Sequence, residues 1–218
     1  MNKSEVLKRI RDTGLIPVVR AESSDLAMRA VAALKAGGLN VLEVTMTVPG
    51  AINVIQALAG EYGDETVIGA GTVLDPETAQ ACIQAGAQFI VSPALNEETI
   101  RFCRRQEVAV FPGALTPTEV VRAWKAGADA VKVFPAGAVG GANYLKALKA
   151  PLPQIELIPT GGVSLKTAAD FIKAGAMALG VGADLVDPKA LRKGNSALIT
   201  ERARQFLEIV QLTRASCA

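Results

Sequence analysis

A short glycine signature recurs four times in this chain, each time between a helical pattern and an apolar run. Its repeats are about 40 to 50 residues apart, close to the length of two strand–helix units. Glycine after a last helical turn supplies the left-handed conformation that ends a helix. The signature therefore predicts strands and helices in regular alternation; its copies are Ala36-Gly37-Gly38, Ala85-Gly86-Ala87, Ala126-Gly127-Ala128 and Ala174-Gly175-Ala176.

Eight short runs have the near-continuous aliphatic composition of parallel strands that are covered on both faces. Each segment between them is long enough for one helix, and several open with a capping residue. The predicted strands are Leu15–Arg20, Val41–Met46, Val67–Val73, Phe89–Pro93, Ala109–Pro112, Ala130–Phe134, Glu156–Thr160 and Ala178–Gly182. The predicted helix starts are Ser24 before 25–35, Asp75-Pro76 before 77–85, Asn96, Thr116-Pro117 and Ser164.

Eight such units predict an α/β fold, a single (β/α)8 TIM barrel that occupies residues 1–218 as one domain. Ser4–Thr13 would be an extra N-terminal helix and Asn195–Thr213 the closing one. A doubly wound open sheet is the alternative. It would need a glycine-rich dinucleotide fingerprint after the first strand, and Arg20-Ala21-Glu22-Ser23 is not one.

Histidine is absent from the sequence, which excludes Ser-His-Asp and Cys-His catalysis and most transition-metal sites. The net charge is only +2 and no basic block occurs, so we expect neither nucleic acid nor a membrane as a partner. No apolar stretch reaches the ~20 residues of a membrane span. The N-terminus lacks a secretory signal pattern, and three cysteines without metal or redox spacing indicate free thiols, so we expect a cytoplasmic protein.

Lys132 lies within Ala130–Phe134, an otherwise apolar run that reads as a buried strand. Burial of an ammonium group is costly and favours the neutral amine, the nucleophile that forms Schiff bases with ketones. Glu43 occupies an equally apolar strand, Val41–Met46. Burial would raise the pKa of this acid, which would suit it to shuttle protons beside the amine. The alternative is that Glu43 and Lys132 form a structural ion pair.

In a barrel, chemistry collects at the carboxyl ends of the strands and in the loops that follow. Polar residues there are substrate-binding candidates: Arg20, Thr45, Thr47, Thr72 and Thr160. Glycine turns follow the last two strands, at Thr160-Gly161-Gly162 and Gly182-Ala183-Asp184, where backbone N–H groups and helix starts form a phosphate cradle in this fold. Asp184 would either point away from a phosphate or weaken its binding.

Several segments together resemble the KDPG/KHG aldolase family, the class I enzymes for 2-keto-3-deoxy-6-phosphogluconate and 4-hydroxy-2-oxoglutarate. The resemblance implies a homotrimer of (β/α)8 barrels, a Schiff-base lysine at Lys132 and an acid/base glutamate at Glu43. It implies pyruvate contacts at Thr72, Pro93 and Phe134, and phosphate contacts at Gly161 and Gly162. The segments run in order from Gly14 to Val186 and include 38–45, 68–73, 91–93, 111–113, 131–136 and 159–163.

Two positions depart from the family pattern. Many members have a carboxylate-binding arginine where this chain has Thr47, so we expect Arg20, at the end of the neighbouring strand, to supply the cation. Members often have a phosphate-binding serine after the last strand, where this chain has Ala183 and then Asp184. This difference favours an unphosphorylated or more varied substrate.

The sequence therefore predicts an aldolase, a lyase that needs neither metal nor cofactor and acts on a small keto acid. It would release pyruvate, with glyceraldehyde 3-phosphate from the phosphogluconate substrate or glyoxylate from 4-hydroxy-2-oxoglutarate. The galactonate epimer is an alternative substrate. A metal-dependent aldolase with Glu43 as ligand, and a non-catalytic trimeric barrel that binds small keto acids, are the alternatives in mechanism and in class.

Overall fold

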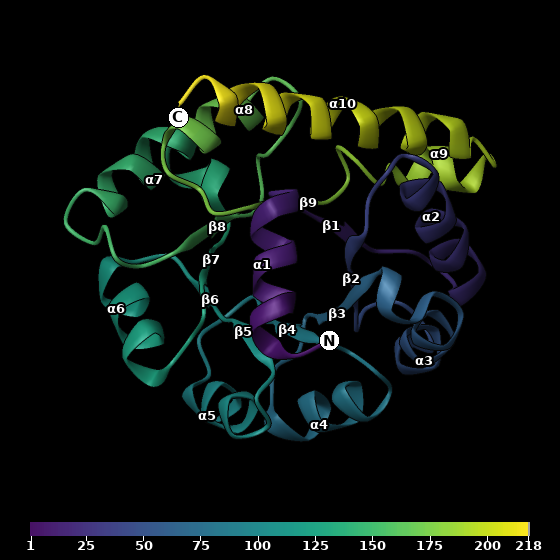
Figure 1. Ribbon diagram of the computed structural model, residues 1–218, viewed down its shortest axis with the longest axis horizontal. Coiled ribbons are helices and arrows are strands. Elements are labelled where there is room, and N and C mark those ends of the chain that lie inside the picture. Colours follow the sequence, from purple (N-terminus) through teal and green to yellow (C-terminus); the bar gives the residue numbers. More distant parts are fainter. Residues whose placement is uncertain (218) are drawn as a thin grey trace.

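The computed structural model describes residues 1–217, apart from the side chain of Asp64. It is an α/β fold in which helices encircle a group of parallel strands (Figure 1). The strands are β1 (Leu15–Val19), β2 (Val41–Thr45), β3 (Val67–Gly71), β4 (Phe89–Val91), β5 (Ala109–Phe111), β6 (Gly113–Ala114), β7 (Val131–Val133), β8 (Leu157–Pro159) and β9 (Leu179–Val181). The helices are α1 (Lys3–Thr13), α2 (Ser24–Ala36), α3 (Ala51–Tyr62), α4 (Pro76–Gln84), α5 (Glu97–Arg105), α6 (Pro117–Ala126), α7 (Gly141–Lys149), α8 (Ala168–Lys173), α9 (Pro188–Arg192) and α10 (Ser196–Ala215), with short 3-10 helices η1 (Gly63–Glu65) and η2 (Ala136–Val139).

The strands pair in two parallel sheets, a six-stranded one in the order β5-β4-β3-β2-β1-β9 and a three-stranded one in the order β6-β7-β8. β1 pairs with both β2 and β9, so the first strand of the chain lies beside the last. An isolated bridge between Thr160 and Gly180 links the two sheets at β8 and β9. At the other junction, β5 and β6 are separated only by Pro112, whose carbonyl accepts a hydrogen bond from Lys132 N at 2.9 Å.

Successive strand residues alternate between two buried environments, as side chains on a β-strand must. Residues of one parity, such as Leu42 and Val44, pack in the main core with the helices. Residues of the other parity, such as Val41 and Ala130, belong to a second core enclosed by the strands. Glu43 and Lys132 share this second parity, each two residues further along its strand than Val41 and Ala130.

Helix α1 lies across the middle of the strand group, as Figure 1 shows. Its buried side chains Val6 and Ile10 join the inner core with Val41, Val67 and Ala109, which lie at the starts of their strands. An Asn2 capping box begins the helix and Gly14, in the left-handed conformation, ends it. The predicted N-terminal helix is therefore present, and it covers the amino ends of the strands.

Three local expectations need correction. Ser23, rather than Ser24, caps α2, because its extended backbone lets its hydroxyl accept a hydrogen bond from Leu26 N at 3.2 Å. No helix begins at Ser164; residues 165–167 form a turn and α8 starts at Ala168. The strands are also shorter than predicted at several ends, since Arg20 and Phe134 follow β1 and β7 instead of ending them.

The first glycine signature also differs from the prediction. Gly37 has a right-handed φ of -83°, and the left-handed residue is Gly38, with φ of +93°. Gly37 is required for space instead, because a Cβ there would lie 2.5 Å from Ala203 Cβ of α10. The glycines of the other three signatures, Gly86, Gly127 and Gly175, are left-handed as expected.

Candidate active site

Lys132 is the middle residue of β7 and is buried, with only 3% of its surface exposed. It pairs with Gly113 of β6 on one side and with Ile158, the middle residue of β8, on the other. Its Nζ lies 5.4 Å from the centroid of the Phe134 ring. The expected buried lysine is therefore present on an inward-facing position of a strand.

Glu43 is the middle residue of β2 and is 2% exposed. Its Oε1 atom is buried and has no hydrogen-bond partner among the described residues. Burial raises the pKa of this carboxyl group, and the charges of Lys132 and Arg20 act in the opposite direction. A buried carboxyl oxygen without a hydrogen-bond partner favours the neutral form of the acid.

Lys132 is close enough to Glu43 for its charge to lower the pKa of the Glu43 carboxyl group. No ion pair joins them among the described residues, so the purely structural pair considered as the alternative does not form. Both side chains instead face the interior enclosed by the strands. A buried amine near a buried carboxyl in this interior can support covalent catalysis by a lysine.

The ends of β1 and β2 bring Arg20 and Thr47 together. Both side chains are exposed, and both line a hollow of about 240 Å³ with apolar walls from Leu26, Pro188 and Leu191. The buried Thr45 hydroxyl donates to the Val19 carbonyl at 3.1 Å and shares a 2.7 Å hydrogen bond with the Thr47 hydroxyl. Arg20 therefore lies where the resemblance leads us to look for a carboxylate-binding cation.

Three further candidates follow the strands β3, β4 and β7. Thr72 has a φ of +60°, a conformation that is unusual for a β-branched residue. Pro93 and Phe134 are both half-buried. Pro93 packs closely on Gly113, because a Cβ built on Gly113 would lie 2.2 Å from the Pro93 carbonyl carbon. All three thus lie beyond the carboxyl ends of their strands, whereas Lys132 and Glu43 are the middle residues of theirs.

The glycine turns after β8 and β9 differ in their surroundings. Gly161 and Gly162 are left-handed, with φ of +82° and +80°, and Gly162 lines a hollow of about 670 Å³ with Lys146 and Lys173. Thr160 is buried, and its Oγ1 would be 2.1 Å from a Cβ at Gly180. Gly182 has open space on its Cβ side and Ala183 is exposed. The first turn thus borders a hollow that is lined by two lysines and by Asp170, and the second turn does not line it.

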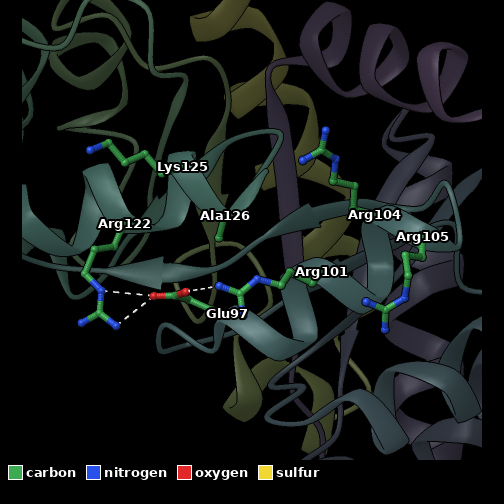
Figure 2. A pocket seen from close by; sticks show the side chains of 7 residues that line it. All are labelled: Glu97, Arg101, Arg104, Arg105, Arg122, Lys125 and Ala126. Atoms are coloured by element: carbon green, nitrogen blue, oxygen red, sulfur yellow. Dashed lines mark hydrogen bonds and ion pairs between the residues drawn. The ribbon is translucent and has the colours of Figure 1, made fainter.

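A larger hollow of about 720 Å³ lies elsewhere, on the outer faces of α5 and α6. Figure 2 shows Arg101 and Arg122 converging on the Glu97 carboxylate, while Lys125, Arg104 and Arg105 point in different directions. Several of these basic residues lie in the last turns of their helices, where they complement the helix dipole. This hollow contains none of the candidate residues.

The described residues also bear on two other kinds of function. No group of three or more histidine, cysteine, aspartate or glutamate side chains there could hold a metal ion. Within the same part of the chain, no helix combines the length and apolar character that crossing a membrane requires.

Gly71 is a site residue that the sequence reasoning did not single out. A Cβ on this residue would lie 1.8 Å from Oε1 of Glu43, so the carboxyl group packs directly on the glycine backbone. Gly71 pairs with Thr45, two residues beyond Glu43 on the neighbouring strand. The alternation of inward and outward residues along two adjacent strands could have suggested the contact, once their register was known.

Comparison with known proteins gives a consistent result. The family model described as KDPG and KHG aldolase matches residues 6–202. The 2-dehydro-3-deoxy-phosphogluconate aldolase of Pseudomonas aeruginosa is 37% identical over 91% of this chain and 90% of its own length. The 2-dehydro-3-deoxy-6-phosphogalactonate aldolase of Escherichia coli is 40% identical over 78% of this chain and 83% of its own.

Among solved structures, the KDPG aldolase of Legionella pneumophila superposes with a TM-score of 0.82 at 32% identity, covering 91% of this chain and 96% of that one. That structure holds pyruvate, captured at low pH as a covalent carbinolamine intermediate. The chain described here belongs to the KDPG and KHG aldolase family. The expected family, and with it the expected enzyme class of aldolases, is confirmed.

Proposed function

We propose that the protein is a class I aldolase that cleaves 2-keto-3-deoxy-6-phosphogluconate, 4-hydroxy-2-oxoglutarate, or both, with Lys132 as the Schiff-base residue. The main observation in support is that Lys132 and Glu43 are both almost fully buried and face the same interior, where the charge of Lys132 lowers the pKa of Glu43 against the effect of burial. This is the pairing of a nucleophile and a proton shuttle that Schiff-base chemistry needs.

In the proposed reaction, the neutral amine of Lys132 attacks the C2 ketone and gives a carbinolamine. The carbinolamine hydroxyl takes up a proton from solvent and leaves as water, which forms a protonated imine. Glu43 then takes the proton of the C4 hydroxyl, and the C3–C4 bond breaks. Its electrons pass into the imine to form an enamine, and the aldehyde product leaves. Protonation of the enamine at C3 and hydrolysis of the imine release pyruvate and restore the amine.

We assign the remaining candidates to substrate binding. Thr72, Pro93 and Phe134 would contact the pyruvate part of the substrate, and Arg20, with Thr47 beside it, would bind the carboxylate. Thr160, Gly161 and Gly162 would hold the distal part, and the lysines near Gly162 support an anionic group there. Gly182 and Ala183 would border the same region after β9.

Borohydride reduction in the presence of pyruvate tests this function. We expect a covalent adduct on Lys132 in the wild type, visible by mass spectrometry of the peptides, and none in Lys132→Met. Absence of an adduct from an enzyme that still turns over would overturn the proposal. Turnover that a chelator abolishes would support a metal-dependent aldolase, whereas binding of a keto acid without turnover would support a non-catalytic barrel.

A second substrate is favoured by one observation. The 40% identity to the 2-dehydro-3-deoxy-6-phosphogalactonate aldolase is higher than the 37% to the phosphogluconate enzyme, although it covers less of the chain. The galactonate epimer at C4 is therefore the alternative substrate. Side-by-side assays of pyruvate release from the two epimers and from 4-hydroxy-2-oxoglutarate would rank them.

We further propose that both sheets form one eight-stranded (β/α)8 barrel and that residues 1–218 make a single domain. Two contacts support a closed ring: β1 pairs with β9, and a bridge from Thr160 to Gly180 links β8 to β9. The break at Pro112 is only one residue long, which supports counting β5 and β6 as one strand. Family membership supports a cytoplasmic homotrimer that acts on a small keto acid. Light scattering of the purified protein would test the trimer.

A further inference from the structure

Gly71, the last residue of β3, lies against the carboxyl group of Glu43. A Cβ built on Gly71 would be 1.8 Å from Oε1, 2.4 Å from Cδ and 2.7 Å from Cγ of Glu43. Three atoms of one side chain therefore occupy the space that any other residue at position 71 would fill. The contact crosses from β2 to β3, whose register pairs Glu43 with Gly69 and Thr45 with Gly71.

Backbone conformation does not explain why position 71 is glycine. Gly71 has no left-handed φ, unlike Gly161 or Gly162, and it lies in a regular strand where any residue could adopt its backbone angles. The preceding residue, Ala70, points to the opposite face of the strand, where its methyl group is fully buried in the core against the helices. Space for the glutamate side chain is the remaining requirement at this position.

We propose that Gly71 is a positioning residue for proton transfer: it gives Glu43 a place in the wall of the site, with Oε1 against the glycine and Oε2 left to exchange protons. This inference rests on the proposed aldolase function. Within residues 1–217, Oε1 is buried and has no hydrogen-bond partner, which is what a group packed against backbone carbons would show. A methyl group at position 71 would move the carboxyl group toward the interior and away from this place.

The chemical consequence concerns two of the proposed steps. Glu43 would take the C4 hydroxyl proton before cleavage and would return a proton to C3 of the enamine afterwards. Attack by Lys132 on the C2 ketone does not depend on where the Glu43 carboxyl group lies relative to C3 and C4. Displacement by about 1 Å can cost 10²-fold in a positioned step. Filling the space at Gly71 should therefore slow proton exchange by Glu43 but leave covalent capture by Lys132 intact.

The first test is a thermal-stability cycle with Gly71→Ala in the wild type and in Glu43→Ala. The added methyl group should lower the melting temperature by about 4 °C or more in the wild type, and by much less where the glutamate side chain is absent. Gly180→Ala is the matched control, because its new Cβ would crowd Thr160 Oγ1 at 2.1 Å and not Glu43. Its cost should be equal in both backgrounds.

The second test measures deuterium exchange at the methyl group of pyruvate, together with borohydride capture of pyruvate. Gly71→Ala should lose about 100-fold in the exchange rate while the covalent adduct on Lys132 still forms. If Gly71→Ala does not fold alone but folds together with Glu43→Ala, the steric coupling is supported. An equal cost of Gly71→Ala in both backgrounds, or exchange at the wild-type rate, would overturn the proposal.

The two tests also separate this inference from the aldolase function. A wild-type protein that shows neither adduct nor exchange, but retains the stability coupling, would overturn the aldolase function and leave the packing of Glu43 on Gly71 supported. A wild-type protein that shows both, without the coupling, would leave the aldolase function standing and overturn the role of Gly71.

Discussion

The Thr45 hydroxyl donates a hydrogen bond to the main-chain carbonyl of Val19 at 3.1 Å, and so joins the ends of β1 and β2. Arg20 follows Val19 directly, and Thr47 follows Thr45 by two residues and is hydrogen-bonded to it at 2.7 Å. These contacts hold the backbone at Val19, and with it the start of Arg20, next to Thr47. The buried Thr45 hydroxyl thus helps to fix the backbone from which the Arg20 side chain extends.

Arg20→Ala should therefore weaken substrate binding without removing covalent chemistry. We expect KM for the keto acid to rise about tenfold, since a charge-assisted hydrogen bond from an exposed arginine is partly screened by solvent. Borohydride capture at saturating pyruvate should remain. Steady-state kinetics check this, with Arg192→Ala, another arginine of the same hollow, as the control that should change KM little. An unchanged KM in Arg20→Ala would exclude Arg20 from carboxylate binding.

Glu43→Gln should make stability less dependent on pH. Burial raises the pKa of Glu43 above its ordinary value of 4.5, so the folded state binds the proton more tightly than the unfolded state. The stability from this group is fully present below pH 4.5 and is lost as pH rises through the higher folded pKa. Glu43→Gln should thus melt higher than the wild type at pH 8, and the gap should close toward pH 4.

Thermal melts across this pH range give the comparison. Glu208→Gln, which removes a carboxylate from the exposed surface of α10, is the matched control and should follow the wild type at every pH. A gap between Glu43→Gln and the wild type that stays constant from pH 4 to pH 8 would show that the burial of the charge is not the cause.

Thr72→Gly should lower activity without lowering stability. The φ of +60° at Thr72 costs about 1 to 2 kcal/mol for a residue with a Cβ, and glycine removes this cost while losing about 1 kcal/mol of chain entropy. Loss of the hydroxyl should still reduce kcat/KM at least about tenfold if Thr72 contacts pyruvate. Melting curves and kinetics of the same variant measure both effects.

Glu107→Gly provides the control for Thr72→Gly, since Glu107 has a φ of +55° and is exposed in the turn between α5 and β5. It should gain a similar relief of strain and keep full activity. Wild-type kinetics in Thr72→Gly would remove Thr72 from the substrate-binding residues.

Ile10→Ala should destabilise the fold while sparing catalysis. Ile10 is fully buried between α1 and the starts of the strands, and its truncation should cost about 2 to 4 kcal/mol. Chemical denaturation measures the loss, and kcat at a temperature where the variant is folded should equal that of the wild type. Ser4→Ala, on the exposed side of the same helix, should change neither quantity. A large fall in kcat would show that α1 also shapes the active site.

The sequence predicted the alternation of strands and helices well, because aliphatic runs such as Val67–Gly71 and capping residues such as Asp75 and Thr116 act locally. Lys132 and Glu43 could be found in the same way, as charges inside apolar runs. The break at Pro112 and the packing of Glu43 on Gly71 could not, since both depend on the register of strands that are distant in sequence. Ser164 failed as a helix start because the following residues form turns first.

Because α1 covers the starts of the strands, we expect Lys132 and Glu43 to be reached from the carboxyl ends of the strands. Substrate, departing aldehyde, pyruvate and the water of hydrolysis would then all pass through one opening. The aldehyde would therefore have to leave before water could enter to hydrolyse the imine. Accumulated pyruvate would compete with substrate for binding.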